Sequence, residues 1–348
     1  MAHVSGKPLQ ERQDQQIDMI KRITVLDVAK MAHVGASTVS RYLRGIPVRR
    51  GAAERIASAV KKLGYVPDEA ARALRAGRSR TIGIVLPKVS NVFFSEATQL
   101  MEEEARKHGS TVILLTHQDH LEQQYEHLLT LRRYRADGVI LTAAPGSDVK
   151  QIQDTLPRVP IVAFDSFLSS EIDSVLLRNR ESARLATEHL LAHGCKHILC
   201  AGAKPEIYSI SERIAGYSEA LQAVQQKPML TVAPDYEQLR YALGAALRSK
   251  NPPDAILSLS DFATLHVLTT FSELSWSADK PVALVSFDDF GYAPLMNPPL
   301  TVIRQPVEKM VCYALSSLFR RIQGNVMEEV QTIALPGELI RRRSCGCI

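Results

Sequence analysis

The chain has 348 residues, of which 45% are hydrophobic and 23% charged, with a formal net charge of +5. This composition is ordinary for a folded protein, the length suffices for two or three domains, and no apolar run approaches the ~18 residues of a membrane helix. The first 18 residues lack the apolar segment of a signal peptide, so we expect a cytoplasmic protein without a membrane partner.

The charge is unevenly distributed. Residues 1–80 hold 16 Lys and Arg against 7 Asp and Glu, whereas the remainder holds 26 against 30. A basic N-terminal quarter joined to a mildly acidic body is typical of a nucleic-acid-binding module with a second domain. A solvated basic face without any nucleic-acid partner would account for this charge distribution equally well.

The N-terminal quarter begins with a polar, Gln-rich and aperiodic stretch over residues 1–22, which predicts a disordered tail. Two short helices follow, VLDVAKMA over 25–32 and ASTVSRYL over 36–43. His33 lies between them, where the turn favours a positive φ that His tolerates better than most residues. Ala29 is small, as a tight helix crossing requires.

The second helix has a polar outward face made of small, hydroxyl and basic side chains: Ala36, Ser37, Ser40, Arg41 and Arg44. A methyl group can contact thymine, hydroxyls can bind phosphates or base edges, and arginine can bind guanine. The pattern therefore predicts a helix-turn-helix that docks on DNA. A three-helix domain with a merely polar face is the alternative.

Two further helical segments complete this region. ERIASAVKKLGY places Ile56, Val60 and Leu63 on one face and ends at Gly64. Pro67 allows a break, and the Ala- and Leu-rich residues 69–76 predict one more short helix before a linker.

After Arg80 the hydrophobic period changes. Short β-branched runs alternate with helical stretches, which predicts doubly wound parallel sheets. The strands are too numerous for one sheet, so we expect two lobes with a cleft between them, and ligands at the carboxyl ends of strands. The predicted strands are TIGIVLP, TVILLT, DGVILTA, PIVAF, DSVLL, HILCAG, AILSLS and VALVSFDD.

These motifs together resemble the LacI/GalR family of bacterial repressors. The resemblance begins with TVLDVAKMAHVGASTVSRYLRG and ERIASAVKKLGYVPDEAARALRAGRSRTIGIVLP, and continues through RADGVILTA, RIAGYSEAL, SFDDFGYAPLMNPPLTVIRQP and LPGELIRRRSCG. It covers about residues 23–346. It implies an all-α headpiece followed by an α/β core of two doubly wound parallel-sheet lobes, like a periplasmic binding protein.

The resemblance also implies the domain organisation and the partners. We expect the headpiece over 23–67, a hinge helix and linker over 68–80, and the core over 81–348. The N-lobe would comprise about 81–178 plus 307–325, and the C-lobe about 179–303 plus 330–346. No heptad repeat follows Ser344, so a homodimer on a palindromic operator is expected, without a tetramerising segment.

On the DNA side, the resemblance assigns base or phosphate contacts to residues of the headpiece, and assigns the wedge that enters the minor groove to Leu74, with two flanking residues. The residues carried over are Thr24, Ala36, Ser37, Thr38, Ser40, Arg41, Arg49, Ala71, Leu74 and Arg75.

In the core, Phe93 matches an aromatic residue that stacks on the effector, and Arg213 and Asp288 match residues that clamp it from the second lobe. Ser209 and Asp261 stand at neighbouring strand ends. An aromatic face, an arginine fork and a carboxylate suit a sugar or sugar acid, with a purine as a second candidate. For each Asp, a helix N-cap is the structural alternative.

The chain departs from the family pattern at four places. Gly35 replaces a Ser or Thr cap, and Arg49 and Arg50 replace a Ser-type cap. Arg178 stands where Asp is usual, and Cys195 where His is usual. The sequence explains neither of the last two.

Two other functions compete with the regulator. An enzyme would need an acid–base pair or a metal, for which Asp288 with Asp289 and the His117-Asp119-His120 stretch are the candidates. A transporter's sugar-binding protein would need a signal peptide. Cys345 and Cys347 have no His or Cys close by in sequence, so no metal, cofactor or catalytic residue is predicted.

Overall fold

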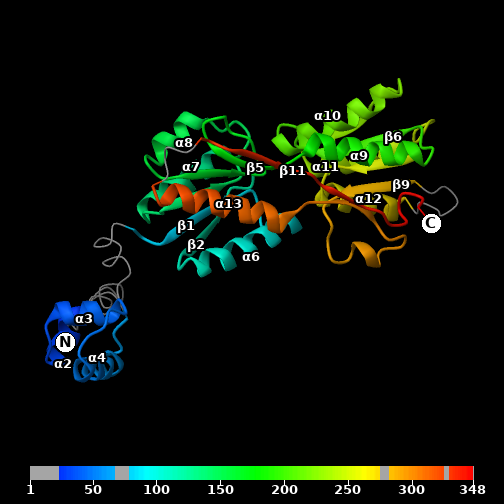
Figure 1. Cartoon of the computed structure of the whole chain (residues 1–348). Helices are drawn as coiled ribbons and strands as arrows, with labels where there is room; N and C mark the ends of the chain where they lie inside the picture. The colour runs from blue at the N-terminus through cyan, green and yellow to red at the C-terminus, as the bar shows by residue number, and fades with distance from the viewer. Residues whose placement is uncertain (1–22, 67–77, 275–281, 325–328, 348) are drawn as a thin grey trace, which may run out of the picture. The chain divides into compact units, whose positions relative to one another are not determined.

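The computed structural model describes residues 23–66, 78–274, 282–324 and 329–347. The chain forms two compact units, Met1–Gly77 and Arg78–Ile348 (Figure 1). Over its described residues, 23–66, the first holds helices α2, α3 and α4, and the second forms an α/β core. The predicted tail over 1–22 and the hinge residues Ala71, Leu74 and Arg75 lie outside the described residues, so their roles stay predictions.

The headpiece helices are α2 (Val25–Ala32), α3 (Ala36–Leu43) and α4 (Arg50–Leu63). Thr24 caps α2: the Asp27 amide donates to its hydroxyl, and the Asp27 carboxylate accepts from the Thr24 amide. His33 ends α2 in the left-handed region, at φ 52° and ψ 48°. The predicted helix-turn-helix is therefore confirmed, including the backbone conformation of its turn.

A small apolar core holds these helices together. Its fully buried members are Val28, Val39 and Ile56, with Ala29, Ala32, Ala59 and Tyr65 beside them. The alanines allow α2 to approach both α3 and α4 closely, because a larger side chain would separate the helix axes. The polar face of α3 remains at the surface.

The N-lobe is built on a six-stranded parallel sheet with the order β11-β5-β4-β3-β1-β2. Its strands are β1 (Thr81–Leu86), β2 (Thr111–Thr116), β3 (Gly138–Leu141), β4 (Ile161–Phe164), β5 (Asp173–Leu177) and β11 (Thr332–Leu335). Its helices are α6 (Val92–Lys107), α7 (Leu121–Arg133), α8 (Val149–Thr155) and α13 (Val307–Ile322).

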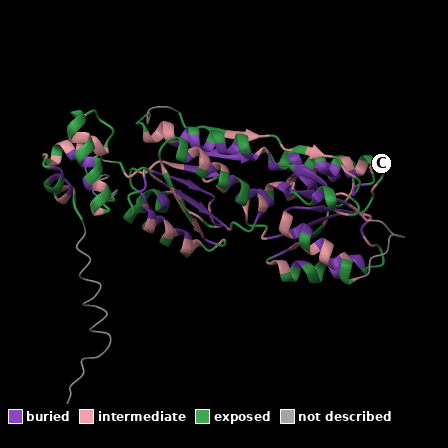
Figure 2. Cartoon of the chain, turned by 90° about the horizontal axis from the view of Figure 1, so that it is seen from below, coloured by how far each residue is buried: buried purple, intermediate pink, exposed green. Residues whose placement is uncertain are grey.

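Helices cover both faces of this sheet. Along β1, Ile82, Ile84 and Leu86 pack with residues of α6 and α13, whereas Val85 packs with residues of α7 and α8. A strand buried on both faces reads as a continuous apolar run, which is why TIGIVL was recognisable. Figure 2 shows the buried residues concentrated on the strands and on the inner sides of the helices.

The C-lobe repeats the design with the order β12-β10-β9-β8-β6-β7, in which only β12 is antiparallel to its neighbour. Its strands are β6 (Ile198–Ala203), β7 (Met229–Ala233), β8 (Ala255–Ser258), β9 (Ala283–Phe287), β10 (Thr301–Arg304) and β12 (Glu338–Ile340). Its helices are α9 (Asn179–Ala192), α10 (Tyr208–Ala223), α11 (Tyr236–Leu247) and α12 (Asp261–Glu273), with a 3₁₀ turn at Ala293–Leu295.

The chain passes between the lobes at residues 177–179, 304–307 and 335–338. The last crossing corrects the expected boundary, which assigned all of 330–346 to the C-lobe. Thr332–Leu335 instead forms β11, which pairs in parallel with β5 of the N-lobe. The four residues TIAL carry no mark of their partner strand, because pairing is decided by hydrogen bonds to the edge of β5 and not by local pattern.

Helices α9 and α10 pack so closely that Gly216 cannot be replaced without movement. A Cβ atom at this position would lie 1.9 Å from the backbone oxygen of Arg180, and neither backbone can yield locally. We expect Gly216→Ala to destabilise the core by about 1–3 kcal/mol, measured as a lower urea midpoint of unfolding.

Gly244→Ala in α11 is the matched control for this prediction. Its Cβ would meet only the flexible end of Arg248, at 3.5 Å, so it should stabilise the helix by about 0.5–1 kcal/mol. Equal midpoints for Gly216→Ala and the wild type would contradict the close packing.

Among the described residues, no helix is both long and apolar enough to cross a membrane.

Candidate functional site

The headpiece presents the predicted DNA-contacting residues mostly at its surface. Ser37, Arg41 and Arg49 are exposed, and so is Thr24, while Ala36, Thr38 and Ser40 are half-buried. Ala36 also packs against the headpiece core. Among the described residues, the Arg41 guanidinium donates only to the Pro47 carbonyl, at 3.4 Å, so it can reach a base edge.

Both helices that carry these arginines begin without a side-chain cap. Gly35, which precedes α3, has no side chain to bind a free amide of the first turn. The Arg49 side chain, which precedes α4, does not bind one either. Neither first turn contains an acidic residue. The positive ends of these two helix dipoles are thus open to an anion such as a DNA phosphate.

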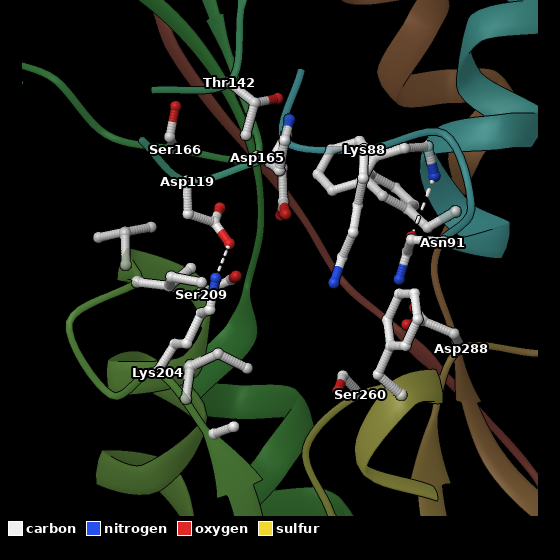
Figure 3. A pocket seen from close by; sticks show the side chains of 18 of the residues that line it. Lys88, Asn91, Asp119, Thr142, Asp165, Ser166, Lys204, Ser209, Ser260 and Asp288 are labelled. Carbon is white, nitrogen blue, oxygen red and sulfur yellow. Dashed lines mark hydrogen bonds and ion pairs between the residues drawn. The ribbon is translucent and has the colours of Figure 1, made fainter. Parts of the chain in front are cut away.

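The core contains a pocket between its lobes, at the carboxyl ends of the strands (Figure 3). It encloses about 770 Å³ including its open mouth. Phe93, Ser209, Arg213 and Asp288 line it, and their contact with an effector stays a prediction. The pocket therefore brings together predicted residues that lie up to 195 positions apart in the sequence.

Phe93 is the aromatic wall from the N-lobe. It is the second residue of α6, is 4% exposed, and stacks on Phe164 with ring centroids 5.6 Å apart. Phe94 meets it edge-on at 5.0 Å. These neighbours fix the ring, so it can offer a rigid apolar surface to a ligand.

Arg213 is buried and pre-organised from the C-lobe. Its Nε donates to Asn179 Oδ1 at 2.7 Å, its Nη1 donates to the Leu259 carbonyl at 2.6 Å, and the guanidinium lies 4.0 Å above the Phe287 ring. Burial lowers its pKa, while Asp288 and Asp165 oppose that shift. Because three contacts hold the fork, little side-chain entropy remains to be lost on binding.

Two carboxylates face this arginine from opposite lobes. Asp288 follows β9, is 5% exposed, and accepts a hydrogen bond from Gln305 Nε2 at 2.6 Å. Asp165 follows β4, and its buried Oδ1 has no hydrogen-bond partner within the described structure. The Oε1 atom of Gln305 is likewise buried without a partner. Such unpaired acceptors are costly unless a ligand supplies donors.

Asp165 also has an unusual ionisation. Burial raises its pKa to about 7; Arg213 opposes the shift and Asp288 adds to it. Because the pKa in the folded state exceeds that of the unfolded chain, this group stabilises the fold below about pH 4, and the contribution is lost as the pH rises through about 7.

We therefore expect Asp165→Asn, which mimics the neutral acid, to gain stability relative to the wild type between pH 5 and pH 8. Urea unfolding at both pH values measures the difference. Asp148 is an exposed helix cap outside the pocket, so the stability difference between Asp148→Asn and the wild type should not increase from pH 5 to pH 8. A pH-independent difference for Asp165→Asn would show that Asp165 is ionised throughout.

A cationic side of the pocket was not predicted from the sequence. Lys88 extends from the N-lobe into the space between the lobes (Figure 3). Its ammonium lies 3.7 Å from the centre of the Phe262 ring and 5.2 Å from that of Tyr236. Burial lowers its pKa, which Asp119 partly offsets. Lys88 has no ion pair among the described residues, so it is available to an anionic ligand.

Contacts across the cleft hold the lobes together beside the pocket. Lys204 of the C-lobe pairs with Asp119 of the N-lobe, with Nζ and Oδ2 2.5 Å apart. Asn91 Nδ2 donates to Asp261 Oδ1 at 2.6 Å, and the Val92 amide donates to the other oxygen. Asp261 is thus placed as a bridge between lobes and does not line the pocket; its predicted contact with the effector stays untested.

Four charged pocket residues share a left-handed backbone: Asp119, Asp165, Lys204 and Asp288 have φ between 53° and 73°. Each follows a strand, and the conformation turns the chain sharply so that the side chain faces the cleft. Non-glycine residues adopt it at some energetic cost, which is commonly found at binding sites. Position at a strand end was the only sequence signal for Lys88, Asp119, Asp165 and Lys204.

The residues that suggested an enzyme are otherwise engaged. Asp289 pairs with Arg304 and Arg342, away from Asp288. His117 is buried, and its Nε2 lies 2.8 Å from the Thr142 carbonyl, while Asp119 pairs with Lys204. Among the described residues, His117, Asp119 and Asp289 are thus held in structural contacts.

The structure shows the surroundings of Arg178 and Cys195, the two residues whose difference from the family pattern the sequence did not explain. Arg178 donates from Nε to the Ala334 carbonyl at 3.1 Å and so ties two interlobe crossings together. Cys195 packs at the edge of the C-lobe core, and burial raises the pKa of its thiol to about 11. A reactive thiolate at Cys195 is therefore disfavoured.

Comparisons with known proteins match this architecture. Residues 24–68 match the model for bacterial regulatory proteins of the lacI family, and residues 79–339 match the model for periplasmic binding proteins and the sugar binding domain of the LacI family. The ribose operon repressor of Halalkalibacterium halodurans is 29% identical over 92% of this chain and 96% of its own length.

Two solved structures resemble the whole fold. A lac repressor dimer bound to operator is 23% identical, with a TM-score of 0.81 over 93% of this chain and 99% of the other. A complex of the transcriptional regulator CelR with cellobiose is 26% identical, with a TM-score of 0.67 over 93% and 100%. With both family models matched in order along nearly its whole length, the chain belongs to the LacI family of bacterial regulatory proteins.

Proposed function

We propose that this protein is a transcriptional repressor that binds a palindromic operator as a homodimer and is controlled by a sugar or sugar acid held between its lobes. The observation that carries the effector class is the set of unpaired buried acceptors, Asp165 Oδ1 and Gln305 Oε1, beside the charged groups of Arg213 and Asp288. No catalytic role is assigned to any residue.

The DNA-binding part rests on the surface of α3. An eight-residue helix reaches only a few base pairs, so specificity requires two headpieces on two half-sites. Ser37, Arg41 and Arg44 are exposed side chains of its outward face with base-reading chemistry. The function places the protein in the bacterial cytoplasm, at the nucleoid.

The effector part follows from complementary hydrogen bonding. Sugar hydroxyls can donate to Asp165, Gln305 and Asp288, while Arg213 donates to hydroxyl or carboxylate oxygens. Phe93 offers an apolar surface to the ring. Lys88 adds a cation without an ion pair, and this favours a sugar acid over a neutral sugar. The related CelR was solved with cellobiose, which supports a carbohydrate over a purine.

Coupling between the two sites would run through the N-lobe. Ser79 and Arg80 leave the hinge segment and donate their amides to the Asp137 carboxylate, both at 2.8 Å. The Arg78 guanidinium donates to the Ile322 carbonyl. Because these bonds fix the start of the core to the N-lobe, a change of lobe angle would move the attachment points of the two hinges.

The test has two stages with the full chain. Selection from a random DNA pool should return a palindrome, and a thermal-shift screen of sugars, sugar acids, sugar phosphates and nucleosides should return an effector. The effector must change operator affinity by the same factor as operator changes effector affinity. Sugar binding without DNA binding would favour a sugar-binding protein, and sugar turnover would favour an enzyme.

Lys88→Met separates the two effector classes. Removing the ammonium should cost about 1.5–3 kcal/mol of affinity for a sugar acid, whereas a neutral sugar should bind with little change. Calorimetry with a matched pair, an aldose and its aldonic acid, measures both. Equal losses for the two ligands would assign Lys88 to packing and not to carboxylate recognition.

A further inference from the structure

A cluster of metal-ligating side chains lies in the C-lobe, separate from the residues that line the effector pocket. His189, His193, Cys345 and Cys347 each direct one ligand atom to the same place, and these atoms all lie within 4.8 Å of one another. In the sequence, the two cysteines have no histidine or further cysteine near them that could complete a metal site. The fold supplies two histidines from residues more than 150 positions away.

The backbone presents all four ligands from two rigid elements. His189 and His193 are four residues apart at the end of α9, so both rings lie on one face of the helix. Cys345 and Cys347 flank Gly346, whose φ of 93° and hydrogen bond to the Arg343 carbonyl make a tight turn. That conformation favours glycine, and it brings both sulfurs to the histidines.

The distances between ligand atoms approach those of a tetrahedral zinc site. Bonds of ~2.3 Å to sulfur and ~2.0–2.1 Å to nitrogen imply ligand separations of roughly 3.3–3.8 Å. Cys345 Sγ lies 3.2 Å from His189 Nε2 and 3.3 Å from Cys347 Sγ. Cys347 Sγ lies 3.2 Å from His193 Nε2 and 3.7 Å from His189 Nε2. Shifts of a few tenths of an ångström would admit the ion.

The surroundings suit thiolate ligands. Cys345 is 1% exposed, and the Thr301 hydroxyl donates to its sulfur at 3.1 Å. Thr301 is itself held, because its oxygen accepts from the Arg342 amide at 2.9 Å. Hydrogen bonds of this kind orient metal ligands and stabilise the bound thiolate.

We propose that His189, His193, Cys345 and Cys347 form a structural Zn²⁺ site that fastens the C-terminal turn to the end of α9. Two imidazoles and two thiolates are a preferred ligand set for Zn²⁺. All four positions are filled by protein, so no position remains for substrate or water chemistry.

The test is metal binding by the full chain, purified with reductant and stripped with a chelator. Zn²⁺ titrated against a chromophoric chelator should bind one per chain. Co²⁺ at the same site should show the thiolate charge-transfer and strong visible bands of a tetrahedral complex. Cys345→Ser with Cys347→Ser should abolish both signals.

His193→Gln is the second variant, since this side chain is exposed and its loss should leave the fold intact. It should weaken Zn²⁺ by at least about 100-fold, the upper end of the loss seen for mere outer-shell partners. Cys312→Ser and His197→Gln, exposed residues outside the cluster, should bind as the wild type does.

Three results would overturn the proposal: absence of stoichiometric Zn²⁺, unchanged affinity in the cysteine or His193 variants, or a Cys345–Cys347 disulfide in the reduced preparation. Elemental analysis reads the stoichiometry, the chelator titration reads the affinity, and mass spectrometry reads the disulfide.

Discussion

Effector affinity is expected to fall roughly 10- to 150-fold when Asp288 is replaced by asparagine, because a hydrogen bond to a charged group contributes about 1.5–3 kcal/mol. The substitution keeps the shape of the side chain and removes the charge that faces Arg213. Asp288 is 5% exposed, so water has little access to replace the lost charged acceptor. Calorimetry with any ligand found in the screen measures the change.

Asp148→Asn provides the control for the Asp288 variant, since it makes the same chemical change at an exposed helix cap. It should bind effector normally. Both variants should bind operator without effector as the wild type does, because the headpiece is untouched. Unchanged effector affinity in Asp288→Asn would remove Asp288 from the site and, with it, the assignment of the pocket.

Arg41→Ala is expected to weaken operator binding by about 1–3 kcal/mol while leaving binding to random DNA nearly unchanged. The side chain is exposed on α3, and the Pro47 carbonyl is its one hydrogen-bond partner in the described part of the chain. It can therefore form the bidentate contact with guanine that carries such an energy. Fluorescence anisotropy with operator and scrambled duplexes at one salt concentration gives the ratio.

Arg49→Ala is the matched control for Arg41→Ala, because it removes a second exposed arginine of the headpiece. Its position at the uncapped start of α4 suits a phosphate contact, so it should weaken both duplexes alike and reduce the slope of log affinity against log salt by about 1. If Arg41→Ala lowers both affinities equally as well, Arg41 contacts the backbone and the base-reading role is wrong.

The pocket combines two kinds of polar group that act on different aspects of binding. Arg213 and Asp288 already have partners in Asn179, Leu259 and Gln305, and so are fixed before a ligand arrives. Within the described structure, Asp165 Oδ1 has no hydrogen-bond partner and Lys88 has no ion pair, so their desolvation is offset only when a ligand pairs with them. Specificity is therefore expected to reside mainly in Asp165 and Lys88.

Much of this organisation could be predicted from local pattern. The helix-turn-helix followed from apolar spacing, small residues and a His that tolerates positive φ, and α2, α3 and α4 formed where the pattern predicted them. Strands such as TIGIVL were visible because burial on both faces makes them continuously apolar. Phe93, Arg213 and Asp288 were assigned through the family resemblance, and the structure brings them together with Ser209 in one pocket at the strand ends.

Tertiary structure alone decided the rest, because the deciding contacts join residues that are distant in sequence. Residues 332–335 joined the N-lobe through hydrogen bonds to β5. Asp261 became a bridge because Asn91 of the other lobe lies within 2.6 Å of it. Lys88 and Asp165 gained significance only from burial in a shared cleft. Likewise, Cys345 and Cys347 acquired histidine neighbours only when the C-terminal turn packed on α9, a proximity that no local pattern encodes.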